Sequence, residues 1–215
     1  MKLDKKDMLL YAVTDRTWEV DGNFYDQVTK ALDGGVTLVQ LREKKLEESE
    51  FVKEAIEIKK ICEKYNVPLI INDNYNVAIM SKADGVHVGQ SDMKVDELRK
   101  IVGDEMIIGV SAQTVEQAIC AENGGANYLG VGAVFNTTSK DDADNVTHDT
   151  LEAICKAVKI PVVAIGGISL QNMGMLQNRG IDGVSVISAI FAQKDITDAT
   201  KKLREKIESV VENGV

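Results

Sequence analysis

The chain is short of basic and aromatic side chains, and both shortages exclude classes of partner. It holds 25 Lys and Arg against 34 Asp and Glu among 215 residues, a formal net charge of −9. Proteins that bind nucleic acid or anionic membranes need a basic surface, so we expect neither partner. Aromatic residues make up 5% of the chain, with one Trp, which leaves little for platforms that stack bases.

Cysteines and long apolar runs are scarce as well. The three cysteines, Cys62, Cys120 and Cys155, are odd in number and lack a C-x-x-C spacing. We therefore expect free thiols on buried helix faces and a reducing compartment. The apolar run Met8–Val13 has six residues, and no later run approaches the ~20 residues of a membrane span. Together these features predict a cytoplasmic protein.

Short runs rich in Val and Ile alternate with amphipathic segments along the chain. Runs that are apolar almost throughout are typical of strands covered on both faces, and a 3.6-residue apolar period is typical of helices. The expected strands are Leu9–Val13, Leu38–Leu41, Leu69–Ile71, Gly85–Val88, Ile107–Val110, Tyr128–Val131, Val162–Ile165 and Val184–Ile187. The expected helices are Tyr25–Leu32, Phe51–Tyr65, Tyr75–Lys82, Val95–Val102, Val115–Asn123, Leu151–Val158, Leu170–Asn178 and Asp195–Val211. Candidate helix N-caps are Asp96, Thr114 and Ser169.

Strands that alternate with helices predict parallel βαβ units. These units form either a closed barrel or an open doubly wound sheet. The first strand-to-helix turn, Thr14-Asp15-Arg16, has no Gly-rich dinucleotide fingerprint, which disfavours the open sheet. No linker or shift in composition divides the chain, so we predict an α/β protein with one (β/α)8 TIM barrel domain, residues 1–215.

Polar residues follow nearly every expected strand, at the end where TIM barrels carry their chemistry. Gly166-Gly167 follows the seventh strand and Ser188 the eighth, which predicts a phosphate site. Arg42 and Lys44 lie two residues apart on one face of an extended segment, an arrangement that suits a diphosphate. The alternative for these two cations is a surface ion pair with Glu43 or Glu47.

Asp73 and Asp92 end neighbouring strands. Mg²⁺ takes one or two protein carboxylates and completes its shell with water and phosphate oxygens, so we expect a Mg²⁺–diphosphate site here. The alternative is that both are helix N-caps or ion-pair partners. His87, in mid-strand, is expected to be a hydrogen-bonded interior residue, and His148 a surface residue; neither has a zinc-ligand spacing.

The segment Asn136–Thr147 is long, polar and without a periodic pattern. Loops of about twelve residues inside compact domains are usually functional or disordered. We predict that this segment is a lid and that it carries Lys140.

Several motifs together resemble the thiamine phosphate synthase family, in the family's order and over almost the whole chain. They are Tyr11-Ala12-Val13-Thr14-Asp15-Arg16, Gln40-Leu41-Arg42-Glu43-Lys44, Ile71-Asn72-Asp73, Gly85-Val86-His87-Val88-Gly89-Gln90-Ser91-Asp92, Thr137-Thr138-Ser139-Lys140 and Ala164-Ile165-Gly166-Gly167-Ile168. The resemblance implies a Mg²⁺-dependent transferase of thiamine biosynthesis. Its small-molecule substrates would be 4-amino-5-hydroxymethyl-2-methylpyrimidine diphosphate and 4-methyl-5-(2-hydroxyethyl)thiazole phosphate, and diphosphate would be released. In the family, the pyrimidine C–O bond is thought to ionise to a cation that the thiazole nitrogen captures.

The resemblance also implies roles for individual residues. The pyrimidine diphosphate would be bound by Gln40, Arg42, Lys44, Asn72, Ser111 and Lys140, of which Arg42, Lys44 and Lys140 would be catalytic. Mg²⁺ would be held by Asp73 and Asp92, and the thiazole phosphate by Thr137, Thr138, Ser139, Gly167, Ile187 and Ser188. The family usually has prolines where this chain has Ala133 and Asn136, which makes the entrance to the lid less rigid.

Three other functions stay open at this point. A thiazole tautomerase would bind a thiazole phosphate without joining it to anything, and it would need no diphosphate site. A non-catalytic protein that binds thiamine phosphate would need only Gly167 and Ser188. Another phosphate-binding barrel is the third. The oligomeric state is also open, a homo-oligomer included, as is a carboxylate on the thiazole substrate.

Overall fold

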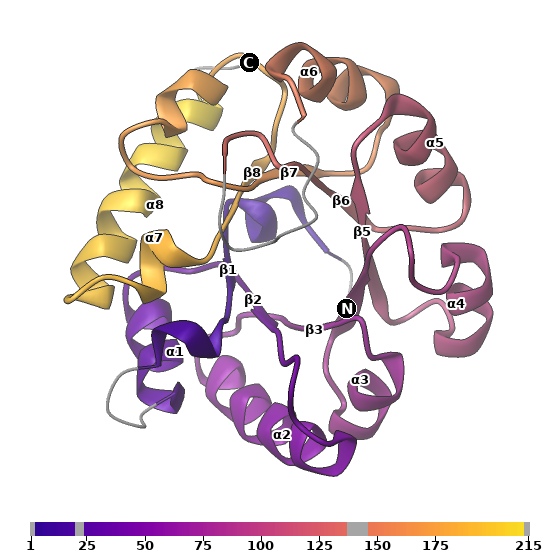
Figure 1. Ribbon diagram of the computed structural model, residues 1–215, viewed down its shortest axis with the longest axis vertical. Helices are drawn as coiled ribbons and strands as arrows, with labels where there is room; N and C mark the ends of the chain where they lie inside the picture. Colours follow the sequence, from indigo (N-terminus) through magenta and orange to yellow (C-terminus); the bar gives the residue numbers. More distant parts are fainter. Residues whose placement is uncertain (1–2, 20–23, 137–145, 213–215) are drawn as a thin grey trace.

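Eight parallel strands close into a barrel in the computed structural model, which describes residues 3–19, 24–136 and 146–212 (Figure 1). The strands are β1 (Leu10–Val13), β2 (Leu38–Leu41), β3 (Leu69–Asn72), β4 (Gly85–Val88), β5 (Ile107–Ala112), β6 (Tyr128–Val131), β7 (Val162–Ile165) and β8 (Gly183–Val186). Each strand pairs with its neighbours in sequence, and β1 closes the barrel by pairing Ala12 with Val39 on one side and with Val186 on the other. The predicted TIM barrel is confirmed.

Helices surround the barrel (Figure 1). They are α1 (Phe24–Asp33), α2 (Glu48–Lys64), α3 (Tyr75–Ser81), α4 (Val95–Val102), α5 (Val115–Asn123), α6 (His148–Ala157), α7 (Ser188–Phe191) and α8 (Ile196–Glu212), with short 3₁₀ helices η1 (Lys5–Met8), η2 (Arg16–Trp18) and η3 (Met173–Leu176). In α2, Phe51, Ala55, Ile58 and Cys62 recur at helical spacing and are all buried. This apolar face is what packs α2 onto the strands.

The predicted α-helix Leu170–Asn178 is wrong, because this segment forms only the 3₁₀ helix η3. The Asn172 side chain accepts a hydrogen bond from the Ser169 backbone N–H (2.8 Å) and donates one to the Gly167 carbonyl oxygen (2.8 Å). Such side-chain-to-backbone bonds compete with the regular helical ladder. Of the predicted N-caps, Thr114 is confirmed by its bond from the Gln117 N–H (3.2 Å). Asp96 and Ser169 are wrong: Lys94 occupies the cap of α4, and Asn172 that of η3.

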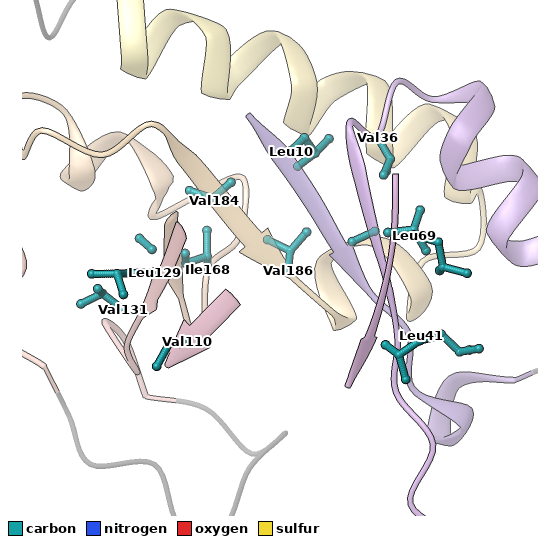
Figure 2. Close-up of a cluster of buried hydrophobic side chains, with 14 of the residues drawn as sticks. Leu10, Val36, Leu41, Leu69, Val110, Leu129, Val131, Ile168, Val184 and Val186 are labelled. Carbon is teal, nitrogen blue, oxygen red and sulfur yellow. The ribbon is translucent and has the colours of Figure 1, made fainter. Parts of the chain in front are cut away.

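Buried side chains form two layers because successive residues of a strand point to opposite faces. The outer layer lies between strands and helices, and Figure 2 shows some of its members, among them Leu10, Leu69 and Val184. The inner layer fills the barrel and includes Met8, Tyr11, Val13, Leu38, Ile70, Ile107, Tyr128 and Val163. The barrel is therefore a packed core whose contents include two tyrosines.

The cysteines differ in burial. Cys62 is buried and Cys155 is half-buried, and burial raises the pKa of each thiol to about 12. Cys120 is exposed, so the expectation of three buried thiols is wrong for this residue. No helix within the described ranges is long and apolar enough to cross a membrane.

Candidate active site

A cavity of about 510 Å³ opens at the carboxyl ends of the strands. Most of the predicted site residues line it: Gln40, Arg42, Lys44, Asn72, Asp73, Asp92, Ser111, Gly167, Ile187 and Ser188. These residues come from six different strands or the turns after them, so it is barrel closure that brings them together. The remaining predicted residues, Thr137, Thr138, Ser139 and Lys140, lie outside the described residues, as does most of the predicted lid.

The two cations among the described residues of the cavity wall are paired with acids from neighbouring strand ends. Arg42 Nη1 lies 3.2 Å from Asp15 Oδ2, and the Arg42 side chain is 16% exposed. Lys44 Nζ lies 2.7 Å from Asp73 Oδ2, with its side chain 49% exposed. The alternative of ion pairs with Glu43 or Glu47 is wrong for this part of the chain, because the partners are Asp15, which follows β1, and Asp73, which lines the cavity.

Glu43 points away from the cavity, although it lies between Arg42 and Lys44. Its carboxylate lies 2.9 Å from Arg16 Nε, and Arg16 also pairs with Glu54 of α2. Burial, followed by the nearby Glu43 carboxylate, raises the pKa of Glu54 to about 7. Glu43 is therefore anchored to α2 on the side of the segment opposite to the two cations.

The two carboxylates predicted to hold Mg²⁺ have different surroundings. Asp73 has a left-handed backbone (φ 62°) and is not a helix cap, since Asn74 caps α3 through a bond from the Val77 N–H (3.0 Å). Asp73 does form an ion pair with Lys44, which is the second alternative that the sequence analysis gave for this residue. Asp92 Oδ2 accepts a hydrogen bond from the Gly89 N–H (2.7 Å) and closes a turn after β4.

No group of three or more His, Cys, Asp or Glu side chains that could hold a metal ion occurs among the described residues. A site with a full set of protein ligands is therefore absent from that part of the chain. Two carboxylates at adjacent strand ends nevertheless fit Mg²⁺, which keeps several waters and takes further oxygens from a phosphorylated substrate. The donor set of Asp73 and Asp92 is thus compatible with Mg²⁺ bound together with a diphosphate.

The predicted phosphate site at Gly166-Gly167 has a second reason to contain glycine. Both residues have positive φ angles, 100° and 63°. A Cβ on Gly166 would collide with Ala133, and one on Gly167 with the Asn136 carbonyl oxygen. The segment after β6 therefore packs directly on these glycines, held by a hydrogen bond from the Phe135 N–H to the Gly166 oxygen (3.1 Å). In this segment, the Gly132–Ala133 peptide bond is cis.

His87 has the hydrogen bonds expected of an interior residue. Its Nδ1 lies 3.0 Å from the Tyr128 hydroxyl and its Nε2 3.0 Å from Ser111 Oγ. His87 also lines the cavity, although the sequence analysis did not include it among the site residues. His148 is half-buried rather than on the surface, because it packs edge-on against Phe135 with ring centroids 5.2 Å apart.

Sequence reasoning missed several other cavity residues, including Tyr11, Gln90, Gln113 and Ser185. Ser185 is 2% exposed, and its Oγ has no hydrogen-bond partner among the described residues. The signal for Tyr11 and Ser185 is alternation: each lies at an inward position of its strand, directly paired in register across β1 and β8. This signal can be used only if it is known which residues of each strand point into the barrel, and near-continuous apolar runs do not show that.

Known proteins resemble this chain over most of its length. The family described as thiamine monophosphate synthase matches residues 10–190. A thiamine-phosphate synthase of Ruminiclostridium cellulolyticum is 50% identical over 201 residues, covering 94% of this chain and 96% of the relative. One of Clostridium acetobutylicum is 48% identical over 195 residues, covering 91% and 92%. The solved thiamine phosphate pyrophosphorylase from Pyrococcus furiosus superposes with a TM-score of 0.89 at 36% identity, covering 96% of this chain and 98% of that chain.

Proposed function

The chain belongs to the thiamine monophosphate synthase family and is a transferase that makes thiamine phosphate, and on that premise we propose its substrates and mechanism. It joins 4-amino-5-hydroxymethyl-2-methylpyrimidine diphosphate to 4-methyl-5-(2-hydroxyethyl)thiazole phosphate and releases diphosphate. The pyrimidine C–O bond ionises, and the thiazole nitrogen captures the resulting cation.

One observation supports this proposal more than any other: two cations and two carboxylates line the same cavity. They lie in segments that follow β2, β3 and β4, which are neighbouring strands of the barrel. Arg42 and Lys44 both line this cavity, as do Asp73 and Asp92. A forked guanidinium and an ammonium group suit the oxygens of a diphosphate. The same groups stabilise the negative charge that grows on the leaving diphosphate as the C–O bond breaks.

Bound by Asp73 and Asp92, Mg²⁺ would supply further positive charge at the leaving diphosphate. The ion pair between Lys44 and Asp73 (2.7 Å) keeps a cation and a carboxylate side by side at this point. Asp73 would hold the metal and Lys44 would bind a phosphate oxygen of the substrate, so each charge would have a partner there.

The described part of the cavity wall contains no Ser/His/Asp or Cys/His set for covalent catalysis by a nucleophile. This described part also contains no cysteine. Ser111 and His87 are 3.0 Å apart, which resembles a nucleophile and its base. The third member of this set, however, is the hydroxyl of Tyr128 rather than a carboxylate. A neutral phenol does not stabilise the imidazolium that a general base must form, so the Ser111–His87 pair supports binding rather than nucleophilic attack.

The test mixes the purified protein with both substrates, with and without Mg²⁺, and measures thiamine phosphate and diphosphate. We expect both products in equal amounts, and only with Mg²⁺. Absence of product under either condition would overturn the synthase proposal. Isomerisation of the thiazole phosphate without coupling would instead identify a tautomerase, and binding of thiamine phosphate without turnover would identify a regulatory protein.

A further inference from the structure

Five side chains from five strands form an unbroken chain of hydrogen bonds across the barrel. Gln40 Nε2 donates to the Tyr11 hydroxyl (2.5 Å), which lies 2.8 Å from the Tyr128 hydroxyl. Tyr128 bonds to His87 Nδ1 (3.0 Å), and His87 Nε2 bonds to Ser111 Oγ (3.0 Å). The middle of the chain is closed to solvent, since Tyr11 is 1% and Tyr128 0% exposed. Its two ends, Gln40 and Ser111, line the cavity.

Two glycines leave the space that this chain of hydrogen bonds occupies. His87 of β4 pairs in register with Gly109 of β5, and Gly109 pairs with Tyr128 of β6. A Cβ on Gly109 would overlap the Tyr128 hydroxyl and His87 Nδ1, and one on Gly130 would come within 3.2 Å of His87 Cε1. His87 and Tyr128 therefore meet across a glycine that lies between them, so the contact is built into the register of three adjacent strands.

The chain of bonds has a direction. Burial raises the pKa of Tyr11 and of Tyr128 well above that of an ordinary tyrosine, so each hydroxyl keeps its single proton. Tyr11 accepts from the Gln40 amide and must give its own proton to Tyr128, which then donates to His87 Nδ1. The imidazole proton is thereby placed on Nε2, where it donates to Ser111 Oγ.

The two ends consequently present opposite hydrogen-bonding groups to the cavity. With its amide nitrogen on Tyr11, Gln40 has its amide oxygen left as an acceptor, and Ser111 has its own proton left to donate. Turning the Gln40 amide over would reverse every bond and exchange the two roles. In either direction one end accepts and the other donates, because each link has one proton to give.

We propose that Tyr11, Tyr128 and His87 are positioning residues that make Gln40 an acceptor and Ser111 a donor toward the pyrimidine ring. The identity of this ring rests on the proposed function. A 4-aminopyrimidine has the complementary pattern, an amino group that donates and ring nitrogens that accept. A 4-oxopyrimidine presents an acceptor where the amino group donates. The relay thus selects the amino form of the ring through Gln40 and Ser111, without touching the reacting atoms.

The first test needs no substrate. The chain has two histidines, so ¹⁵N spectra of the histidine-labelled full-length protein are simple to assign with a His148→Gln variant. We expect a neutral His87 with its proton on Nε2 and with the Nδ1 shift of a hydrogen-bonded ring nitrogen. Tyr128→Phe should abolish that Nδ1 shift. The matched control Tyr65→Phe, which removes a hydroxyl bonded to Asp33 on the surface, should not change it. A proton on Nδ1 in the wild type, or an unchanged Nδ1 shift in Tyr128→Phe, would overturn the relay.

The second test measures selectivity. We expect the preference in kcat/KM for the 4-amino substrate over its 4-oxo analogue to fall by roughly tenfold in Tyr128→Phe, the effect of about one hydrogen bond. The KM for the pyrimidine diphosphate should rise while that for the thiazole phosphate stays within about twofold, which a general loss of structure would not produce. Tyr11→Phe is the second variant if Tyr128→Phe does not fold. An unchanged preference in a folded variant contradicts the proposal.

The two tests separate failure of the relay from failure of the proposed function. If the wild type makes no thiamine phosphate, but His87 has its proton on Nε2 and loses the Nδ1 shift in Tyr128→Phe, the proposed function fails and the relay stands. If the wild type is active and neither the Nδ1 shift nor the selectivity responds to Tyr128→Phe, the relay fails and the function stands.

Discussion

At the scale of single residues, alternation separates charges that are adjacent in sequence. Arg42 and Lys44 face the cavity, whereas Glu43 between them is buried beside Arg16 and Glu54. The acid therefore does not neutralise the cations next to it, because an extended segment sends alternate side chains to opposite sides. The same contact anchors the segment that carries both cations to α2.

The buried Glu43–Glu54 pair predicts a pH dependence of stability. The pKa of Glu54 is raised from 4.5 to about 7, so between these values the folded protein binds a proton that the unfolded chain has lost. The free energy of unfolding should therefore fall as pH rises through this window and change no further above it. Glu54→Gln, which mimics the protonated form, should flatten this slope. Urea unfolding of both proteins from pH 5 to pH 8 measures it.

Glu57→Gln is the matched control, since Glu57 is exposed on the same helix and pairs with Lys60. This control should keep the wild-type slope. If Glu54→Gln and the wild type lose stability in parallel as pH rises, the proton that the folded protein binds in this pH window is not on Glu54.

Arg42 and Asp73 predict a division of the site into two halves. Arg42→Ala and Asp73→Ala should each lower turnover by about a hundredfold or more, because they remove charge stabilisation of the leaving diphosphate. Calorimetric binding of the thiazole phosphate should stay within about threefold of wild type, since its expected contacts lie at Gly167 and Ser188. Arg179→Ala, which breaks a surface ion pair with Glu152, is the control and should leave both quantities unchanged. Equal loss of thiazole phosphate binding would show that the site is divided differently.

At the scale of elements, the turn after β7 and the segment after β6 are packed as one unit. Gly167 contacts Phe135 and Asn136 so closely that no side chain fits between them. The prolines expected by resemblance at residues 133 and 136 are absent, and the described part of this segment is held instead by backbone hydrogen bonds. These run from the Phe135 N–H to Gly166 (3.1 Å) and from the Val146 N–H to Ala133 (2.7 Å).

Gly167→Ala should therefore destabilise the protein more than a positive φ angle alone explains. Gly103 is the matched control, because it also has a positive φ (71°) but nothing within 4 Å of an added Cβ. We expect Gly103→Ala to cost about 1–3 kcal/mol from backbone strain, because its ψ of −174° lies in a region that is essentially restricted to glycine. Gly167→Ala should cost about 1–3 kcal/mol more, the usual effect of overpacking. Urea unfolding compares the two, and equal losses would argue against direct packing of the two turns.

At the scale of the whole molecule, the net charge of −9 does not describe the site. Exposed charges are largely screened beyond about 10 Å at 0.1 M salt. A diphosphate in the cavity would therefore be affected mainly by the charged groups that line it, Arg42, Lys44, Asp73 and Asp92, rather than by acids on the outer helices. The balance of charge among the described residues of the cavity wall, two cations and two carboxylates, therefore differs from that of the whole chain, in which acids outnumber bases.

Because the barrel is closed and forms one core, a ligand in the cavity should stabilise the whole domain. At about 100 times its Kd, the pyrimidine diphosphate should raise the free energy of unfolding by about 2.7 kcal/mol. Thermal unfolding with Mg²⁺ and with EDTA measures this effect. We expect the larger increase with Mg²⁺, and only a small one in Asp73→Ala. The same increase in EDTA would show that Asp73 and Asp92 do not act through a metal ion.

Features that depend on neighbouring residues in the chain were predictable. Apolar runs, helical periods and strand-end residues such as Gly167, Asp73 and Arg42 predicted the barrel and ten of the residues that line the cavity. That residues 170–178 form only the 3₁₀ helix η3 was not predictable in this way, since the bonds of Asn172 to Ser169 and Gly167 compete with the helical pattern.

Local sequence patterns were enough to predict the fold and the charged residues at the cavity. Strands, helices and strand ends can be recognised from the polarity of a few consecutive residues. The relay from Gln40 through Tyr11, Tyr128 and His87 to Ser111 exists only after barrel closure. Its members come from β2, β1, β6, β4 and β5, and their contacts depend on strand register, on inward facing and on the space left by Gly109. None of these quantities is local. For that reason His87 looked like an ordinary core residue in the sequence and proved to be part of the cavity wall.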